Sequence, residues 1–191
     1  MSKRNKRLQS AKSYIDALSE QYSKLNIIRV EFGYTQATSK TMTLEKANED
    51  FEHMLNNRRT KPTIFKDQVG YVCKREHGDE RGIHFHAIFI YDGQKVQNDV
   101  IKGKQIGEYW KHLTNNQGTY HNCNLSDYRH KGIGMLDHRD VEKRQILDEK
   151  VINYLCKEEQ DIEPIKKNNK DRAFTRGTIS KTKKKLGRPR S

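Results

Sequence analysis

Hydrophobic residues recur along several stretches at the spacing of one helix face. In residues 10–25 the positions Ala11, Tyr14, Leu18, Tyr22 and Leu25 lie about 3.6 residues apart, as in an amphipathic helix. The same spacing predicts further helices over residues 43–57, where Thr43 is a candidate N-cap, and over residues 96–113 and 141–159, the last one capped by Asp140.

Other stretches alternate between apolar and polar positions and are rich in β-branched and aromatic residues. They predict strands over residues 27–34, 69–75 and 83–91. Residues 77–82, HGDERG, have the composition of a turn, so the second and third strands should form a hairpin. Residues 115–140 predict one or two short strands, including 132–136, and no regular structure is expected from residue 166 onward.

Because the strands are joined mainly by hairpins, the pattern predicts an α+β fold with a central antiparallel sheet and helices packed on it. The 191 residues suffice for a single domain. We expect residues 1–25 to form a basic arm and amphipathic helix, residues 26–165 the folded domain, and residues 166–191 a basic tail.

The net charge of +13 is concentrated at the two ends. Residues 1–12 carry +5 and residues 166–191 carry +10, so the remainder carries −2. Basic segments on a near-neutral body favour a nucleic acid as the partner, because neutralised phosphates release counterions. A solvated, disordered end is the alternative.

The apolar composition argues against a membrane partner. The tail has only Ile179 and Leu186 as apolar anchors, and no stretch of 18 apolar residues or signal-peptide core is present. We therefore expect a cytoplasmic protein. Three widely spaced cysteines without a CxxC pair indicate reduced thiols and argue against a disulfide framework or a structural zinc site.

Two histidines interrupt the apolar strand GIHFHAIFIYDG. Side chains alternate along a strand, so His84 and His86 should share one face and Phe85 should point to the other. Two imidazoles on one face can converge on a cation. Glu76, near the end of the preceding strand, is a candidate third ligand, with His77 as the competing choice; a merely polar strand face is the alternative.

These residues, combined with Tyr154 and Lys157 in the later helix, resemble the HUH endonuclease superfamily. Within it the chain is most similar to replication initiators of filamentous single-stranded DNA phages and related prophage proteins. That closer resemblance rests on RVEFGY, RGIHFHAIFIYDG, GIG, YLCK, RAFTRG and GRPR, and it spans residues 27–190. It implies the HUH/RRM-like palm as the fold of residues 26–165.

The resemblance implies an enzyme that nicks single-stranded origin DNA and starts rolling-circle replication. Tyr154 would be the nucleophile and would form a 5′-phosphotyrosyl bond, while Lys157 would supply positive charge. Glu76, His84 and His86 would hold Mg²⁺ or Mn²⁺. The implied partners are single-stranded DNA or an origin hairpin in a bacterial host, a polymerase that extends the 3′-hydroxyl, and a host helicase.

Some members of this superfamily use two tyrosines one helical turn apart. Here Lys150 and Glu158 stand four residues from Tyr154, which indicates a single-tyrosine enzyme. Closing a replicated circle would then need a second protomer or a second visit of the same residue. Tyr120 and Tyr128 are possible helpers.

The C-terminal region offers further candidates for nucleic-acid contacts. RAFTRG alternates cations with a phenylalanine, a pattern suited to backbone contact and base stacking, although a strand that packs on the body fits it equally well. The ending KTKKKLGRPRS is interpreted mainly as a phosphate-binding tail, and its GRPR resembles part of an AT-hook. The candidates are Arg172, Phe174, Arg176, Lys183, Lys184, Lys185, Arg188 and Arg190.

Two other functional classes fit the same residues. One is an HUH relaxase or single-strand transposase, which would differ in its DNA substrate. The other is a DNA-binding regulator that keeps the fold but binds no metal. The nicking hypothesis requires that the helix bearing Tyr154 packs over the face of His84 and His86 and not over the face of Phe85.

Overall fold

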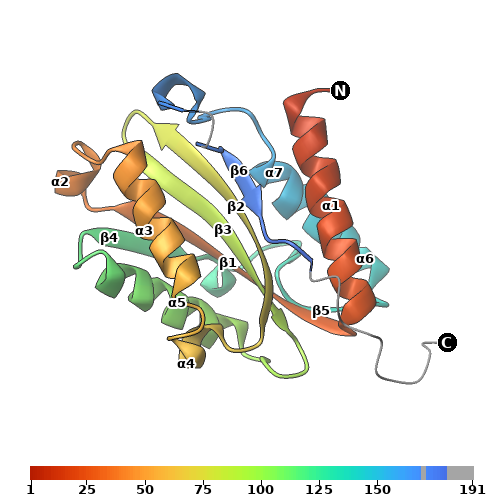
Figure 1. Cartoon of the computed structure of the whole chain (residues 1–191). Helices are drawn as coiled ribbons and strands as arrows, with labels where there is room; N and C mark the ends of the chain where they lie inside the picture. The colour runs from red at the N-terminus through yellow and green to blue at the C-terminus, as the bar shows by residue number, and fades with distance from the viewer. Residues whose placement is uncertain (169–170, 180–191) are drawn as a thin grey trace.

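The computed structural model, which describes residues 1–168 and 171–179, shows a layered α+β domain (Figure 1). Its strands are β1 (Lys24–Tyr34), β2 (Gln68–Gly78), β3 (Gly82–Asp92), β4 (Gly118–Asn122), β5 (Gly134–Asp137) and β6 (Phe174–Arg176). Its helices are α1 (Lys3–Gln21), α2 (Gln36–Ser39), α3 (Leu44–Asn56), α4 (Pro62–Phe65), α5 (Asp99–Leu113), α6 (Val141–Ile146) and α7 (Asn153–Leu155). Short 3₁₀ turns η1 (Cys123–Leu125) and η3 (Glu163–Ile165) and a π-helical segment η2 (Leu147–Ile152) complete the chain.

The sheet is six-stranded and antiparallel, in the order β4-β1-β3-β2-β6, and β5 also pairs with β1. The predicted hairpin is confirmed, although β2 and β3 are longer than expected and leave a short turn between Gly78 and Gly82. Gly82 has a φ of 62°, a backbone conformation that glycine adopts without strain. The long hairpin therefore places its central residues deep inside the domain.

Helices cover both faces of the sheet. Figure 1 shows α3 and α5 on one side and α1, α6 and α7 on the other. The first side holds an aromatic core in which Phe51 stacks on Phe85 and Trp110 packs against Phe32. The second side is aliphatic and includes Ile88 of the central strand. Both faces of β3 are therefore buried, whereas the sequence predicted only one apolar face.

Helix α1 is longer than predicted and belongs to the body of the domain. It begins at Lys3, where the Ser2 side chain accepts a hydrogen bond from the Asn5 amide and caps the helix. Its residues Ala11, Tyr14 and Leu18 are buried in the aliphatic core. The predicted amphipathic helix is thus present, and its apolar face packs on the sheet.

Regular structure also continues beyond residue 166. Strand β6 pairs with β2, so Phe174 lies opposite Lys74 and Arg176 opposite Val72. The prediction of irregular structure there was wrong for these residues, because the free edge of β2 gives their backbone hydrogen-bonding partners. None of the helices in the described ranges has the length and apolar content needed to cross a bilayer.

Candidate metal centre and tyrosine

The register of the β2–β3 hairpin brings the predicted metal ligands together. Glu76 lies directly opposite His84, and His86 lies two positions further along the same face. The Oε2 atom of Glu76 is 3.1 Å from His84 Nε2 and 3.0 Å from His86 Nε2. The three ligand atoms lie within 4.8 Å of one another, and all three residues are buried. They form the predicted cluster, which we call the triad.

His77, the alternative third ligand, lies outside the triad. It is paired with Ile83, on the face opposite to that of Glu76. Its backbone amide donates a hydrogen bond to the carbonyl of Gln160, which fixes the strand edge. Strand alternation therefore selects Glu76 over His77.

The second ring nitrogen of each histidine is also occupied. His84 Nδ1 lies 3.0 Å from the carbonyl oxygen of Gly82, which can only accept, so Nδ1 is the donor. His86 Nδ1 is 3.0 Å from Glu31 Oε1, a close ionic contact that is not aligned as a hydrogen bond. With the Nδ1 atoms engaged in this way, both Nε2 atoms face one carboxylate oxygen. Two imidazole nitrogens and a carboxylate oxygen, all of them electron-pair donors, require protons or a cation between them. The three side chains therefore fit a divalent metal ion.

A buried lysine holds the other oxygen of Glu76. Lys74 Nζ is 2.7 Å from Glu76 Oε1 and also donates to the carbonyl of Glu159 at 3.0 Å. Burial alone would raise the pKa of Glu76, but hydrogen bonds from His84, His86 and Lys74 hold it well below its usual range. Glu76 is therefore ionised, with Oε2 directed at the histidines.

A second carboxylate, Glu31 on β1, contacts the triad residue His86. Burial would raise the pKa of Glu31, but the contact with His86 and the charges of Arg29 and Arg81 lower it to about 2. Arg29 forms a 2.7 Å ion pair with it, so this negative charge is also compensated. A carboxylate behind a metal-binding histidine fixes the orientation of the ring.

Tyr154 lies over the triad, on the face required by the nicking hypothesis. Its ring is 5.5 Å from that of His86, centroid to centroid, with the two planes nearly perpendicular. The Arg29 guanidinium lies 5.0 Å above the tyrosine ring and Lys157 Nζ lies 5.1 Å from its centre. Tyr154 is 37% exposed, so the group opens to solvent at the tyrosine.

The electrostatic surroundings of Tyr154 favour the protonated phenol in the metal-free protein. Partial burial raises the pKa of Tyr154, the charges of Glu76 and Glu31 raise it further, and Arg29 and Arg81 oppose them. A divalent cation at the triad would offset the two carboxylates and favour the phenolate.

The segment that carries Tyr154 differs from the regular helix predicted over residues 141–159. The helix is interrupted by the π segment η2 and ends at Leu155. Leu147, Val151 and Ile152 of η2 are buried in the aliphatic core, while Tyr154 projects toward the triad. The wider π turn allows the three apolar residues to stay buried while Tyr154 faces the triad. Turns of this kind often occur at functional sites. Lys157 consequently follows the helix and does not belong to it.

Helix α1 anchors this segment. Arg7 forms a bidentate ion pair with Asp161, at 2.7 and 3.2 Å. It also donates a hydrogen bond to the Lys157 carbonyl at 3.3 Å. Arg4 donates to the Asn153 side chain at 2.9 Å. These two cations of the basic N-terminus are thus engaged within the protein.

The C-terminal candidates that the structure describes lie on or beside strand β6, and Phe174 lies directly opposite Lys74, the residue that pairs with Glu76. Phe174 packs against the aliphatic core, and the Arg176 guanidinium lies 5.1 Å above the Tyr14 ring, as a strand packed on the body would place them. The Arg172 carbonyl accepts a hydrogen bond from Arg75. DNA contact by these three residues stays a prediction. The remaining candidates, Lys183, Lys184, Lys185, Arg188 and Arg190, lie outside the described residues.

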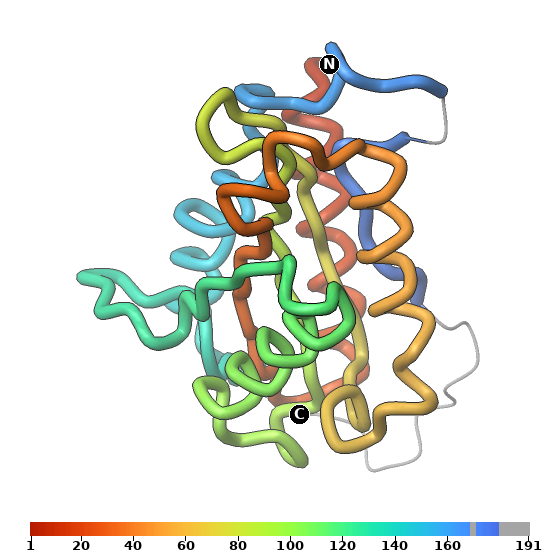
Figure 2. The backbone as a smooth tube through the Cα atoms, turned by 90° about the vertical axis from the view of Figure 1, so that its left-hand side faces the viewer, coloured from red at the N-terminus to blue at the C-terminus, as the bar shows by residue number. Residues whose placement is uncertain are grey.

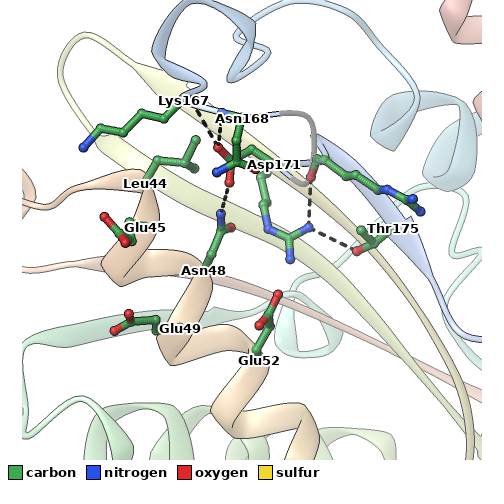
Figure 3. Close-up of a pocket in the computed structure, with 11 residues that line it drawn as sticks. Leu44, Glu45, Asn48, Glu49, Glu52, Lys167, Asn168, Asp171 and Thr175 are labelled. Atoms are coloured by element: carbon green, nitrogen blue, oxygen red, sulfur yellow. Dashed lines mark hydrogen bonds between the residues drawn. The ribbon is translucent and has the colours of Figure 1, made fainter.

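A separate pocket lies on the aromatic side of the sheet, between α3 and the chain around Asp171 (Figure 3). Asn48 donates to Asp171 across it at 3.0 Å, and Arg75 donates to Thr175 at 3.2 Å. Of the predicted site residues within the described ranges, only Arg172 lines it. The pocket is therefore distinct from the triad.

Sequence reasoning missed three charged residues of the site: Arg29, Glu31 and Lys74. A signal was present for the first two, because Arg29 and Glu31 alternate with Ile28, Val30 and Phe32 just as the histidines alternate with apolar residues. Charges on one face of a central strand must be compensated by a partner. Lys74 had no comparable signal, since lysine is ordinarily exposed.

Comparison with known proteins gives a family for this chain. Residues 2–177 match the family described as the YagK/YfjJ C-terminal domain. That match includes the triad, Tyr154 and strand β6. No match was found among curated proteins or among solved structures.

Proposed function

The chain belongs to the YagK/YfjJ C-terminal domain family, a prophage-associated family, and we propose that it is a metal-dependent endonuclease of the HUH type that nicks single-stranded origin DNA. The observation that carries this proposal is the position of Tyr154 over the triad of Glu76, His84 and His86. A tyrosine hydroxyl that shares a partly open site with a metal-binding cluster is suited to attack on a phosphodiester.

The cation would polarise the scissile phosphate and neutralise charge that develops on its oxygens. Mg²⁺ and Mn²⁺ both accept a carboxylate, and Mn²⁺ accepts imidazole more readily. Glu76 would ligate through Oε2 alone, because Lys74 holds Oε1. Lys74 compensates the charge of Glu76, and Arg29 compensates that of Glu31. The charge of the metal ion would therefore remain available to the phosphate.

The tyrosine then forms the covalent bond. Its oxygen attacks phosphorus, the phenol proton leaves to solvent, and the bond from phosphorus to the 3′ oxygen breaks. That oxygen takes a proton and becomes a 3′-hydroxyl, so one phosphodiester is exchanged for another and the step is reversible. Arg29 above the ring and Lys157 beside it would stabilise the phenolate and the attacked phosphate.

We therefore propose that the protein is a replication initiator. A protein bound to the 5′ phosphate of the nick, together with a DNA strand that ends in a free 3′-hydroxyl, is the starting point of rolling-circle synthesis. The test is incubation of the purified protein and Mn²⁺ with labelled single-stranded DNA that covers the origin of its own replicon. We expect a covalent protein–DNA adduct on a denaturing gel when the label is placed on the 3′ side of the nick, because the tyrosine is joined to the 5′ phosphate of that fragment.

Tyr154→Phe and chelation should each abolish the adduct. Tyr120→Phe is the matched control, since Tyr120 lies on β4 and donates to Glu108 at 2.8 Å on the protein surface. An adduct that persists in Tyr154→Phe would disprove the assignment of Tyr154 as the nucleophile. Absence of an adduct with any hairpin-forming origin would favour the metal-free regulator.

A further inference from the structure

A projecting loop lies next to the triad and has no role in the chemistry proposed above. Residues 125–131, which we call the projecting loop, extend away from the body after strand β4 (Figure 2). Leu125 is 67% exposed and Tyr128 37% exposed, and both belong to the few large apolar side chains that face solvent among the described residues. Arg129, His130 and Lys131 are exposed beside them.

The base of the loop is fixed to the strand that carries Arg29. Asn124, which is buried, accepts a hydrogen bond from the Arg29 amide at 2.8 Å and donates to the carbonyl of Ile27 at 3.0 Å and to Asp99 at 2.7 Å. Lys131, at the other end of the loop, donates to the Asn124 carbonyl at 3.2 Å. Both ends of the loop are therefore anchored on one buried residue.

The loop is continuous with the opening at Tyr154. Arg29 contacts the tyrosine ring and, through its backbone, Asn124. His121 on β4 lies directly opposite Glu31, so it shares the triad face, and its Nε2 lies 3.3 Å from the Ser126 hydroxyl. A series of contacts therefore links Tyr154, through Arg29 and Glu31, to His121 and the loop residue Ser126.

We propose that the projecting loop binds the single-stranded DNA that adjoins the cleaved phosphate. Tyr128 would stack on an unpaired base, and Arg129 beside it would contact an adjoining phosphate. Aromatic rings interleaved with cations are suited to a single strand, because every unpaired base offers a stacking face. This inference rests on the proposed function in taking the strand to be the substrate.

The test measures binding separately from cleavage. In a Tyr154→Phe background, fluorescence anisotropy with a labelled oligothymidylate of about 20 nucleotides gives the Kd. Tyr128→Ala combined with Arg129→Ala should raise the Kd about tenfold. The matched control is Ile101→Ala combined with Lys104→Ala, which removes one exposed apolar side chain and one exposed cation from α5 on the other side of the sheet. It should change the Kd less than about twofold.

The same oligonucleotide with 5-iodouracil in place of thymine should crosslink to the protein at Tyr128 on irradiation, as located by mass spectrometry. Loop variants that bind the single strand as tightly as the background protein would overturn the inference, as would an equal loss of affinity for a duplex of the same length. These outcomes are independent of the adduct assay. If the wild-type protein forms the adduct but the loop variants bind the single strand normally, the role of the loop is disproved and the proposed nicking function is not.

Discussion

Lys74 and Glu76 form an ion pair of 2.7 Å inside the sheet, and the lysine side chain is completely buried. Its Nζ lies beside a cluster that fits a cation, so the lysine charge compensates Glu76 when no metal is bound. Removal of one partner from a buried ion pair leaves an uncompensated charge. We therefore expect Lys74→Met to lower the free energy of unfolding of the metal-free protein by about 3 kcal/mol, measured by urea denaturation in EDTA.

Saturating Mn²⁺ should restore part of that loss, and the stabilisation by Mn²⁺ should exceed that of the wild type because the metal then neutralises an unpaired carboxylate. Lys111→Met is the control, since Lys111 pairs with Glu108 at 3.5 Å, both side chains are exposed, and the loss of this pair should matter much less. A Lys74→Met protein as stable as the wild type without metal would contradict this account of the pair.

Metal affinity should depend on the triad and on Glu31. We expect Glu76→Gln or His84→Gln to weaken Mn²⁺ binding by more than about tenfold, and Glu31→Gln by about tenfold, because Glu31 orients the His86 ring. Isothermal titration calorimetry measures the affinity. His77→Gln is the control, because its side chain lies on the other face of β2. Equal losses in His77→Gln and His84→Gln would show that the triad is misassigned.

The contact between α1 and the tyrosine segment should be visible in a double-mutant cycle. Arg7→Ala and Asp161→Ala each remove the same charge-assisted pair, so each should lower the free energy of unfolding by about 2 kcal/mol. The double variant should lose much less than the sum. Lys3→Ala, which removes a longer and exposed pair with Glu163, serves as the control. Strict additivity of the two losses would mean that Arg7 and Asp161 are not energetically coupled.

The cysteines should be unreactive in the folded protein. All three are free and buried, and burial raises the pKa of Cys73 to about 12 and those of Cys123 and Cys156 to about 11. Thiolate is the reactive form, so Ellman's reagent at neutral pH should label none of them until the protein unfolds. Immediate labelling of any one of them would show that its surroundings open readily.

The sequence was informative wherever a short-range pattern determined the geometry. Alternation along β3 correctly placed His84 and His86 opposite Phe85, and the hairpin brought in Glu76. The same alternation did not reveal that the histidine face is buried, because its cover comes from α1 and from the segment around Tyr154, both remote in sequence.

Long-range polar contacts could not be predicted from the sequence either. Arg4 and Arg7 were interpreted as part of a basic end available to nucleic acid, yet their partners, Asn153 and Asp161, lie some 150 residues away. Local composition gives no information about such pairings. Strand β6 was only one of two interpretations of RAFTRG, since a three-residue strand forms only because β2 offers it a free edge.

The π segment η2 has a consequence for comparing this chain with its relatives. A π turn accommodates about one residue more than an α turn, so fourteen positions from Asp140 to Tyr154 here correspond to about thirteen in an uninterrupted helix. A relative with a straight helix would present its tyrosine to the equivalent triad with one residue fewer. Alignments that forbid a gap between residues 147 and 152 would then pair Tyr154, the proposed nucleophile, with a neighbouring residue and wrongly report the tyrosine as lost.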